Sequence, residues 1–140
     1  MEKGHAVAMA LRWYSIVIDS RDPEALARWW GETLGWPLVY LSDEGDEAVI
    51  APPFADDLAG TVPREQQPQG LVFVPVPEDK TVKNRLHIDL APAPDESLQD
   101  AVDSLVARGA ALADIGQQEV PWVVLTDPEG NEFCVLTPRE

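Results

Sequence analysis

The chain has 140 residues, of which 45% are hydrophobic and five are tryptophan, enough to build one domain of ordinary size around its own core. Its 25 acidic and 10 basic residues give a formal net charge of −15. A surface this acidic repels the phosphates of nucleic acids and of anionic membranes, so neither is expected as a partner. Neutral and cationic small molecules are compatible with it.

The single cysteine, Cys134, has no partner for a disulfide within the chain. Near the N-terminus, residues 6–11 form only a short apolar patch, and no apolar run in the sequence is long enough to span a bilayer. These features predict a cytoplasmic protein without a membrane span.

The first predicted elements are a strand over residues 14–18 and an amphipathic helix after it. Asp22 and Pro23 mark the start of the helix, because aspartate caps free backbone N–H groups and proline needs no N–H at the first helical position. Gly35 is expected to end it. The apolar positions follow a spacing of i, i+3, i+4 and i+8, which places them on one stripe. They are Leu26, Trp29, Trp30 and Leu34.

Three further strands are predicted over residues 36–41, 47–51 and 71–76. The segment over residues 52–70 separates the last two and is rich in Pro, Asp, Gln and Gly. It is too long for a tight hairpin, so it is either a lid over a site or a surface insertion.

The second half of the chain repeats this order. A strand over residues 86–90 precedes a helix-start signal at residues 94–96, an amphipathic stretch and strands over 110–115, 122–126 and 132–137. The separations are nearly constant: 72 residues from Ser15 to His87, 73 from Asp22 to Asp95 and 74 from Gly35 to Gly109. Such a series predicts a duplicated β-α-β-β-β unit and an α+β fold of two tandem modules.

One domain over residues 1–140 should hold both modules, the first over about 12–77 and the second over about 85–138, with a linker over about 78–84. Lys80, Lys83 and Arg85 at the linker supply 3 of the 10 basic residues. We expect them to pair with acidic neighbours, and anion binding is the alternative.

The most informative polar residues are His87 and Asp89. They alternate with apolar residues, so both side chains share one face of the predicted strand. This face is either the wetter side of a half-buried strand or a site where the imidazole orients a ligand or moves a proton. Glu132 and Cys134 share a face for the same reason, and we expect Cys134 to be a packed thiol because its sequence neighbours include no base.

Residues 83–90, 107–110 and 122–136 resemble the vicinal oxygen chelate superfamily, and more narrowly its glyoxalase-like and bleomycin-resistance-like members. The turn and strand D-P-E-G-N-E-F from Asp127 are the most specific part, and the resemblance spans about residues 12–138. It implies an eight-stranded mixed sheet curved into a cup, helices outside it, a ligand site in the hollow, and a homodimer.

In metal-dependent members, the resemblance implies ligands from the first and last strands of each unit. His87 and Glu132 match two of these positions, whereas Ser15 and Leu71 at the other two are not metal ligands. The other histidine, His5, lies outside the pattern. We therefore expect an incomplete metal set. No cofactor is expected, because the sequence contains no nucleotide or phosphate-binding motif, and a divalent metal at His87 and Glu132 is the alternative.

The sequence thus predicts a glyoxalase-like protein that binds a neutral or cationic small molecule in the cup between its modules. Two alternatives stay open: a metal-dependent lyase, isomerase or dioxygenase, and metal-free acid–base catalysis. His87 and Glu132 are the candidate catalytic residues. The candidate ligand-binding residues are Ser15, Phe73, His87, Asp89, Trp122 and Glu132.

Overall fold

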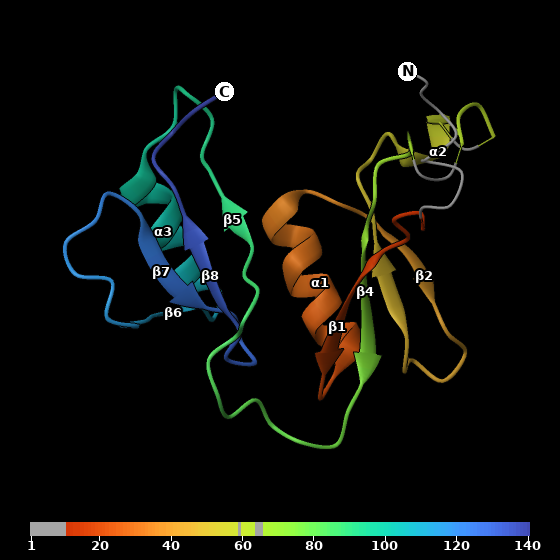
Figure 1. Cartoon of the computed structure of the whole chain (residues 1–140), viewed down its shortest axis with the longest axis horizontal. Coiled ribbons are helices and arrows are strands. Elements are labelled where there is room, and N and C mark those ends of the chain that lie inside the picture. The colour runs from red at the N-terminus through yellow and green to blue at the C-terminus, as the bar shows by residue number, and fades with distance from the viewer. Residues whose placement is uncertain (1–10, 59, 64–65) are drawn as a thin grey trace. The chain divides into compact units, whose positions relative to one another are not determined.

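The structure is a computed structural model that describes residues 11–58, 60–63 and 66–140. It divides into two compact units that meet in sequence between Val76 and Pro77 (Figure 1). Each unit contains a four-stranded mixed sheet and one long helix, which confirms the α+β class and the duplicated β-α-β-β-β order. Among the described residues, no helix has the length and apolar character needed to cross a membrane.

The first unit consists of strands β1 (Ile16–Ser20), β2 (Leu38–Leu41), β3 (Ala48–Ile50) and β4 (Leu71–Pro75), helix α1 (Pro23–Leu34) and the short helix α2 (Ala55–Leu58). Its sheet has the order β1-β4-β3-β2. Strand β1 runs parallel to β4, and the other pairs are antiparallel. Helix α2 lies in the segment that was predicted as a lid or insertion.

The second unit consists of strands β5 (Asp89–Leu90), β6 (Ala111–Leu112), β7 (Val123–Thr126) and β8 (Glu132–Val135), with helix α3 (Leu98–Ala107) after β5. Its sheet has the order β5-β8-β7-β6, and β5 runs parallel to β8. The first strand of each unit therefore pairs in parallel with the last, as a duplicated unit requires.

Helix α1 begins and ends where the sequence predicts. The carboxylate of Asp22 accepts a hydrogen bond from the backbone N–H of Ala25 at 3.2 Å, Pro23 is the first helical residue, and Gly35 ends the helix with a φ of 71°. The helix packs closely on the sheet at Gly31, where a Cβ would lie 2.8 Å from the carbonyl oxygen of Trp36. This close approach requires glycine inside the helix.

Helix α3 begins later than the signal at residues 94–96 predicts. Its N-cap is Ser97, whose hydroxyl accepts a hydrogen bond from the backbone N–H of Asp100 at 3.2 Å. Glu96 instead closes a turn by donating its backbone N–H to the carbonyl of Ala93 at 3.0 Å. Serine caps a helix as well as aspartate does, so the expected N-cap at Asp95 is wrong by two residues.

Each unit buries its own apolar core. In the first unit the core includes Leu26, Trp30, Ala48, Ile50, Leu71 and Phe73. In the second it includes Val102, Leu105, Val124, Leu125, Phe133 and Val135. Burial of each Val, Leu, Ile or Phe side chain in these cores contributes about 1.5–3 kcal/mol before the loss of chain entropy is counted.

Candidate functional site

The pairing of β5 with β8 defines the candidate site in the second unit. Asp89 and Cys134 are partners in this parallel register, so their side chains lie on the same sheet face. Alternation places His87 and Glu132 on that face too, and it places the buried Phe133 on the opposite one. We call the face that carries His87, Asp89, Glu132 and Cys134 the polar face of the second sheet.

His87 and Asp89 contact each other at the solvent-exposed part of this face. The Nε2 atom of His87 lies 3.1 Å from Oδ1 of Asp89, and the two side chains are 47% and 50% exposed. A carboxylate at this distance orients the imidazole ring, and the exposure lets an external molecule reach both groups. The sequence prediction that these two side chains share a face is confirmed.

Cys134 lies beside this pair but is buried. One donor atom from each of His87, Asp89 and Cys134 can be chosen so that all three lie within 4.8 Å of one another. Burial raises the pKa of the Cys134 thiol and the Asp89 carboxylate raises it further, whereas the charge of Lys83 acts in the opposite direction. Cys134 is therefore a protonated, packed thiol at neutral pH, as the sequence predicts.

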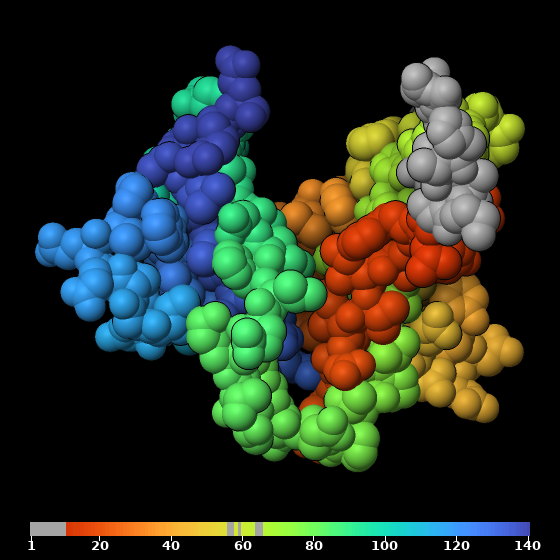
Figure 2. All heavy atoms as spheres, in the orientation of Figure 1, coloured from red at the N-terminus to blue at the C-terminus, as the bar shows by residue number. Residues whose placement is uncertain are grey.

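Glu132 is held by the linker rather than open to a ligand. Its Oε2 accepts a hydrogen bond from the ammonium of Lys80 at 3.0 Å, and its Oε1 accepts one from the backbone N–H of Asn84 at 2.9 Å. The side chains of Lys80 and Glu132 are only 19% and 13% exposed. The expected pairing of the linker cations with an acidic neighbour is confirmed for Lys80. Figure 2 shows the linker, in light green, at the surface.

The charge state of Glu132 follows from these contacts. Partial burial raises the pKa of this carboxyl, but hydrogen bonds from Asn84, from Lys80 and from its own backbone, together with the charge of Lys80, outweigh burial, so the pKa lies below its usual value. Glu132 is therefore ionised at neutral pH, and both of its oxygens already have partners within the second unit.

Phe73, one of the predicted ligand-binding residues, lies in the core of the first unit rather than on an exposed face. It pairs with Ala48 and shares a sheet face with Ile50, and Cγ2 of Ile50 lies 3.4 Å from where a Cβ on Gly31 would be. This face is therefore the one that α1 covers, and Phe73 is 0% exposed within the core. The prediction assigned the correct strand but not the direction in which its side chains point.

Leu71 lies on the same helix-covered face, opposite Ile50, so it is not the structural counterpart of Glu132. The other face of the first sheet is apolar instead. Val17 pairs with Val72, Val72 with Val49 and Val49 with Tyr40. Val17 and Tyr40 are 53% and 51% exposed, and the two-residue alternation of β1 and β2 was the signal that could have identified them.

The remaining predicted residues lie in different places. Ser15 directly precedes β1 in the first unit and is half-buried. Trp122 directly precedes β7 in the second unit and is 39% exposed. His5 lies outside the described residues. Of the six candidate ligand-binding residues, His87, Asp89 and Glu132 thus share the polar face of the second sheet, and Trp122 lies at the start of β7 in the same unit.

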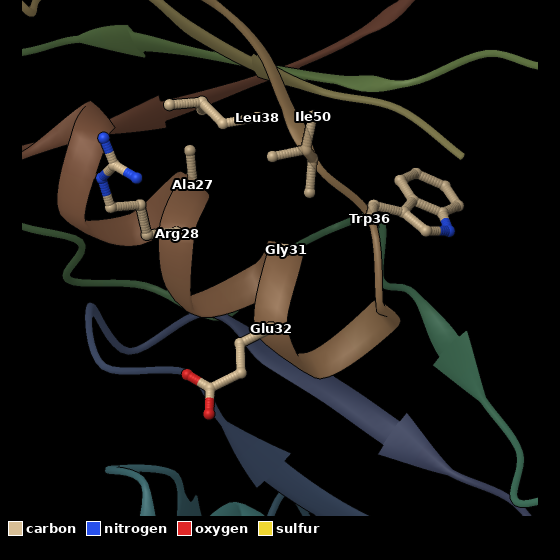
Figure 3. Close-up of a pocket in the computed structure, with 7 residues that line it drawn as sticks. All are labelled: Ala27, Arg28, Gly31, Glu32, Trp36, Leu38 and Ile50. Carbon is tan, nitrogen blue, oxygen red and sulfur yellow. The ribbon is translucent and has the colours of Figure 1, made fainter. Parts of the chain in front are cut away.

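A separate pocket of about 240 Å³ lies along α1 in the first unit (Figure 3). It contains no predicted site residue. One of its charged side chains, Arg28, is paired with Glu24 at 2.8 Å on the same helix. The lining residues are Ala27, Arg28, Gly31, Glu32, Trp36, Leu38 and Ile50.

A family model described as the glyoxalase-like domain matches residues 15–136, which is most of the chain. The chain belongs to this family. A search of curated protein sequences gave no significant match to this glyoxalase-like protein.

Solved structures share the fold of this glyoxalase-like protein at low sequence identity. A glyoxalase/bleomycin resistance protein/dioxygenase family enzyme from Burkholderia phytofirmans is 15% identical with a TM-score of 0.65, covering 92% of this chain and 100% of that one. The fosfomycin resistance protein FosX from Listeria monocytogenes is 12% identical with a TM-score of 0.62, covering 94% of both chains. A hypothetical protein from S. aureus is 12% identical with a TM-score of 0.65, covering 96% of this chain and 99% of that one. The resemblance to the vicinal oxygen chelate superfamily is confirmed.

The residues at the metal-ligand positions of this superfamily do not fit a metal ion. A cation bound at Glu132 would have to displace the ammonium of Lys80, which lies 3.0 Å from Oε2. In the first unit, Ser15 and Leu71 supply no suitable ligand, and the register places apolar Val72 on the open face. We therefore assign no metal to the pair His87 and Glu132.

Proposed function

We propose that this glyoxalase-like protein binds a small neutral or cationic molecule on the polar face of the second sheet, with His87 and Asp89 as its polar anchor. The supporting observation is the 3.1 Å contact between these two half-exposed side chains. Asp89 accepts hydrogen bonds and carries a negative charge, while the imidazole can donate or accept, so the pair can orient a polar ligand.

The charges around this face favour a cationic or neutral ligand. The Glu132 carboxylate is balanced by the ammonium of Lys80, whereas Asp89 is half-exposed and contacts an imidazole, a group that can donate or accept a hydrogen bond. The chain as a whole carries a net charge of −15, and this field attracts cations and repels anions. A cationic or neutral ligand is therefore favoured over an anionic one.

Trp122 supplies an aromatic surface in the same unit. It precedes β7, and alternation from Val124, which pairs with Cys134, places Trp122 on the polar face. An indole ring can stack on a flat ligand and attract a cation to its face. Trp122 also offers a fluorescence signal from the same sheet face as the proposed anchor.

Fluorescence titration with matched cationic, neutral and anionic aromatic compounds tests the proposal. We expect saturable changes for cationic or neutral members of the panel, and at least tenfold weaker binding for Asp89→Asn and His87→Gln, about 1.4 kcal/mol or more. Asp95→Asn is the matched control, because it removes the same charge from an exposed turn. No saturable change up to about 1 mM, a binding free energy of roughly −4 kcal/mol, would remove the support.

A second candidate function is proton transfer by His87 with Asp89 as its orienting carboxylate. The contact between them favours this pair over the predicted pair of His87 and Glu132, because Lys80 and Asn84 engage Glu132. A substrate that His87→Ala turns over as fast as the native chain would exclude this role.

A further inference from the structure

The polar face of the second sheet brings together three different donor types. His87 offers an imidazole nitrogen, Asp89 a carboxylate oxygen and Cys134 a thiol sulfur. The atoms that these residues can offer all lie within 4.8 Å of one another. This set shares only His87 with the pair His87 and Glu132, because its other two members are Asp89 and Cys134.

The backbone fixes this arrangement. Asp89 and Cys134 are register partners in β5 and β8, and the backbone N–H of Cys134 donates to the carbonyl of Ile88 at 3.0 Å. His87 is held from the other side by its 3.1 Å contact with Asp89. His87 and Asp89 thus come from the β5 segment and Cys134 from the neighbouring strand β8. Asp89 and Cys134 are already held in place by strand pairing, without a bound ion.

We propose that His87, Asp89 and Cys134 form a binding site for one divalent cation of the zinc class. Nitrogen, oxygen and sulfur donors together suit Zn²⁺, whereas Mg²⁺ and Ca²⁺ prefer oxygen alone. Zinc binds such donors at about 2.0–2.3 Å, so donors that share one ion lie closer together than the 4.8 Å within which these atoms now lie. The three side chains must therefore move slightly toward one another on binding.

Three protein ligands leave one coordination position of a tetrahedral ion open. Sites of this kind hold a water molecule or another small ligand in the fourth position, whereas structural zinc sites use four protein ligands. His87 and Asp89 are half-exposed, so the open position would face the solvent. Binding converts the Cys134 thiol to a thiolate and releases its proton to the solvent.

The surrounding charges set the strength of the site. Lys83 lies close enough to Cys134 to act on its charge and would oppose a cation, while Asp89 and the thiolate would supply two negative charges. The ammonium of Lys80 is neutralised by Glu132. The balance favours a cation at the three donors over one at Glu132.

Titration of the untagged full chain with Zn²⁺ and with Co²⁺ tests this site without any organic ligand, so its outcome is distinguishable from that of the proposed function. We expect one bound ion per chain and a near-ultraviolet thiolate-to-cobalt charge-transfer band. Because Cys134 is the single cysteine, this band can arise from no other residue.

Variants separate the three donors from Glu132. Cys134→Ser should abolish the charge-transfer band. His87→Gln and Asp89→Asn should each weaken Co²⁺ binding by at least about 100-fold, more than the roughly 10- to 100-fold lost when a residue that only hydrogen-bonds to a metal ligand is replaced. Glu132→Gln should keep the charge-transfer band and weaken Co²⁺ binding much less than His87→Gln or Asp89→Asn, because it removes no donor and only leaves the ammonium of Lys80 without its neutralising partner. The circular dichroism spectrum and thermal unfolding of each variant report whether it folds, and His87 and Asp89 are exposed enough to be replaced without core damage.

Two results would overturn the site. One is the absence of a thiolate band when the native chain is saturated with Co²⁺. The other is loss of metal binding in Glu132→Gln together with retention in Asp89→Asn, which would place the ion at the superfamily position instead.

Discussion

Glu132 and Lys80 are 52 residues apart in sequence but form an ion pair at 3.0 Å with both side chains mostly buried. Glu132 is at a position that matches a metal ligand in the superfamily, and in this chain its carboxylate is bound to Lys80 instead. It also fastens the linker to the start of β8, so it couples the stability of the second unit to the composition of the linker. The side chains of this face that the linker does not engage include His87 and Asp89, and the proposed site is built on them together with Cys134.

Lys80→Met should destabilise the second unit, because it leaves the Glu132 carboxylate mostly buried without its cationic partner, although hydrogen bonds from backbone N–H groups such as that of Asn84 remain. We expect a loss of about 1–3 kcal/mol in the free energy of unfolding, measured by urea denaturation. The double variant with Glu132→Gln should recover part of this loss, as a double-mutant cycle would show.

The matched control is Arg28→Met. Arg28 pairs with Glu24 across one helical turn, and the two side chains are 57% and 40% exposed. Removal of such an exposed pair should cost only about 0.3–0.5 kcal/mol. Equal losses for the two variants would contradict the role assigned to burial of Glu132.

Glu132 should make stability depend on pH in the acidic range. Its pKa is lowered in the folded chain, so its contribution to stability is fully present above the unfolded pKa and is lost as the pH falls through the folded pKa. Urea denaturation at a series of pH values from neutral to acidic should show a steeper loss for the native chain than for Glu132→Gln. Parallel curves for the two chains would contradict the lowered pKa.

Asp89→Asn should make the Cys134 thiol more reactive. The Asp89 carboxylate raises the pKa of this thiol, so its removal should lower the pKa and increase the thiolate fraction at mildly alkaline pH. Rates of alkylation by iodoacetamide measure this, with Asp95→Asn as the control of equal charge. An unchanged or slower rate in Asp89→Asn alone would show that the carboxylate does not act on the thiol.

Gly31→Ala should destabilise the first unit although alanine is the better helix former. A methyl group at this position would lie 2.8 Å from the carbonyl oxygen of Trp36, which is closer than contact distance. We expect a loss of about 1–3 kcal/mol from overpacking, against a gain of about 0.5–1 kcal/mol from helix propensity. Thermal unfolding of the two chains measures the difference, and a net gain in stability would show that α1 can move away from the sheet.

Much of the fold could be predicted from the sequence, because its signals are local. The cap at Asp22, the glycine at position 35 and the repeated order of elements each depend on neighbouring residues. The start of α3 was missed because Asp95 and Ser97 are both suitable caps and the turn at Glu96 decides between them. Local propensity does not rank such competing signals.

The site was less predictable, because it depends on the phase and register of paired strands. Alternation alone placed His87 beside Asp89, and the structure confirms it. The sequence identifies Phe73 only as a strand aromatic, and its phase decides its place, since a one-residue change of phase sends every side chain of a strand to the other face; in the structure it lies in the core. The contact of Asp89 with Cys134 follows from the register of β5 with β8, which no local pattern encodes. Homodimer formation and cytoplasmic location stay predictions.

The central claim is that His87, Asp89 and Cys134, rather than His87 and Glu132, form the functional site. Anomalous diffraction at the zinc absorption edge, from crystals grown with Zn²⁺, tests it most directly. We predict one peak about 2.3 Å from the sulfur of Cys134, with His87 and Asp89 completing the protein ligands. A peak bound to Glu132 with Lys80 displaced, or no peak near Cys134, would contradict the claim.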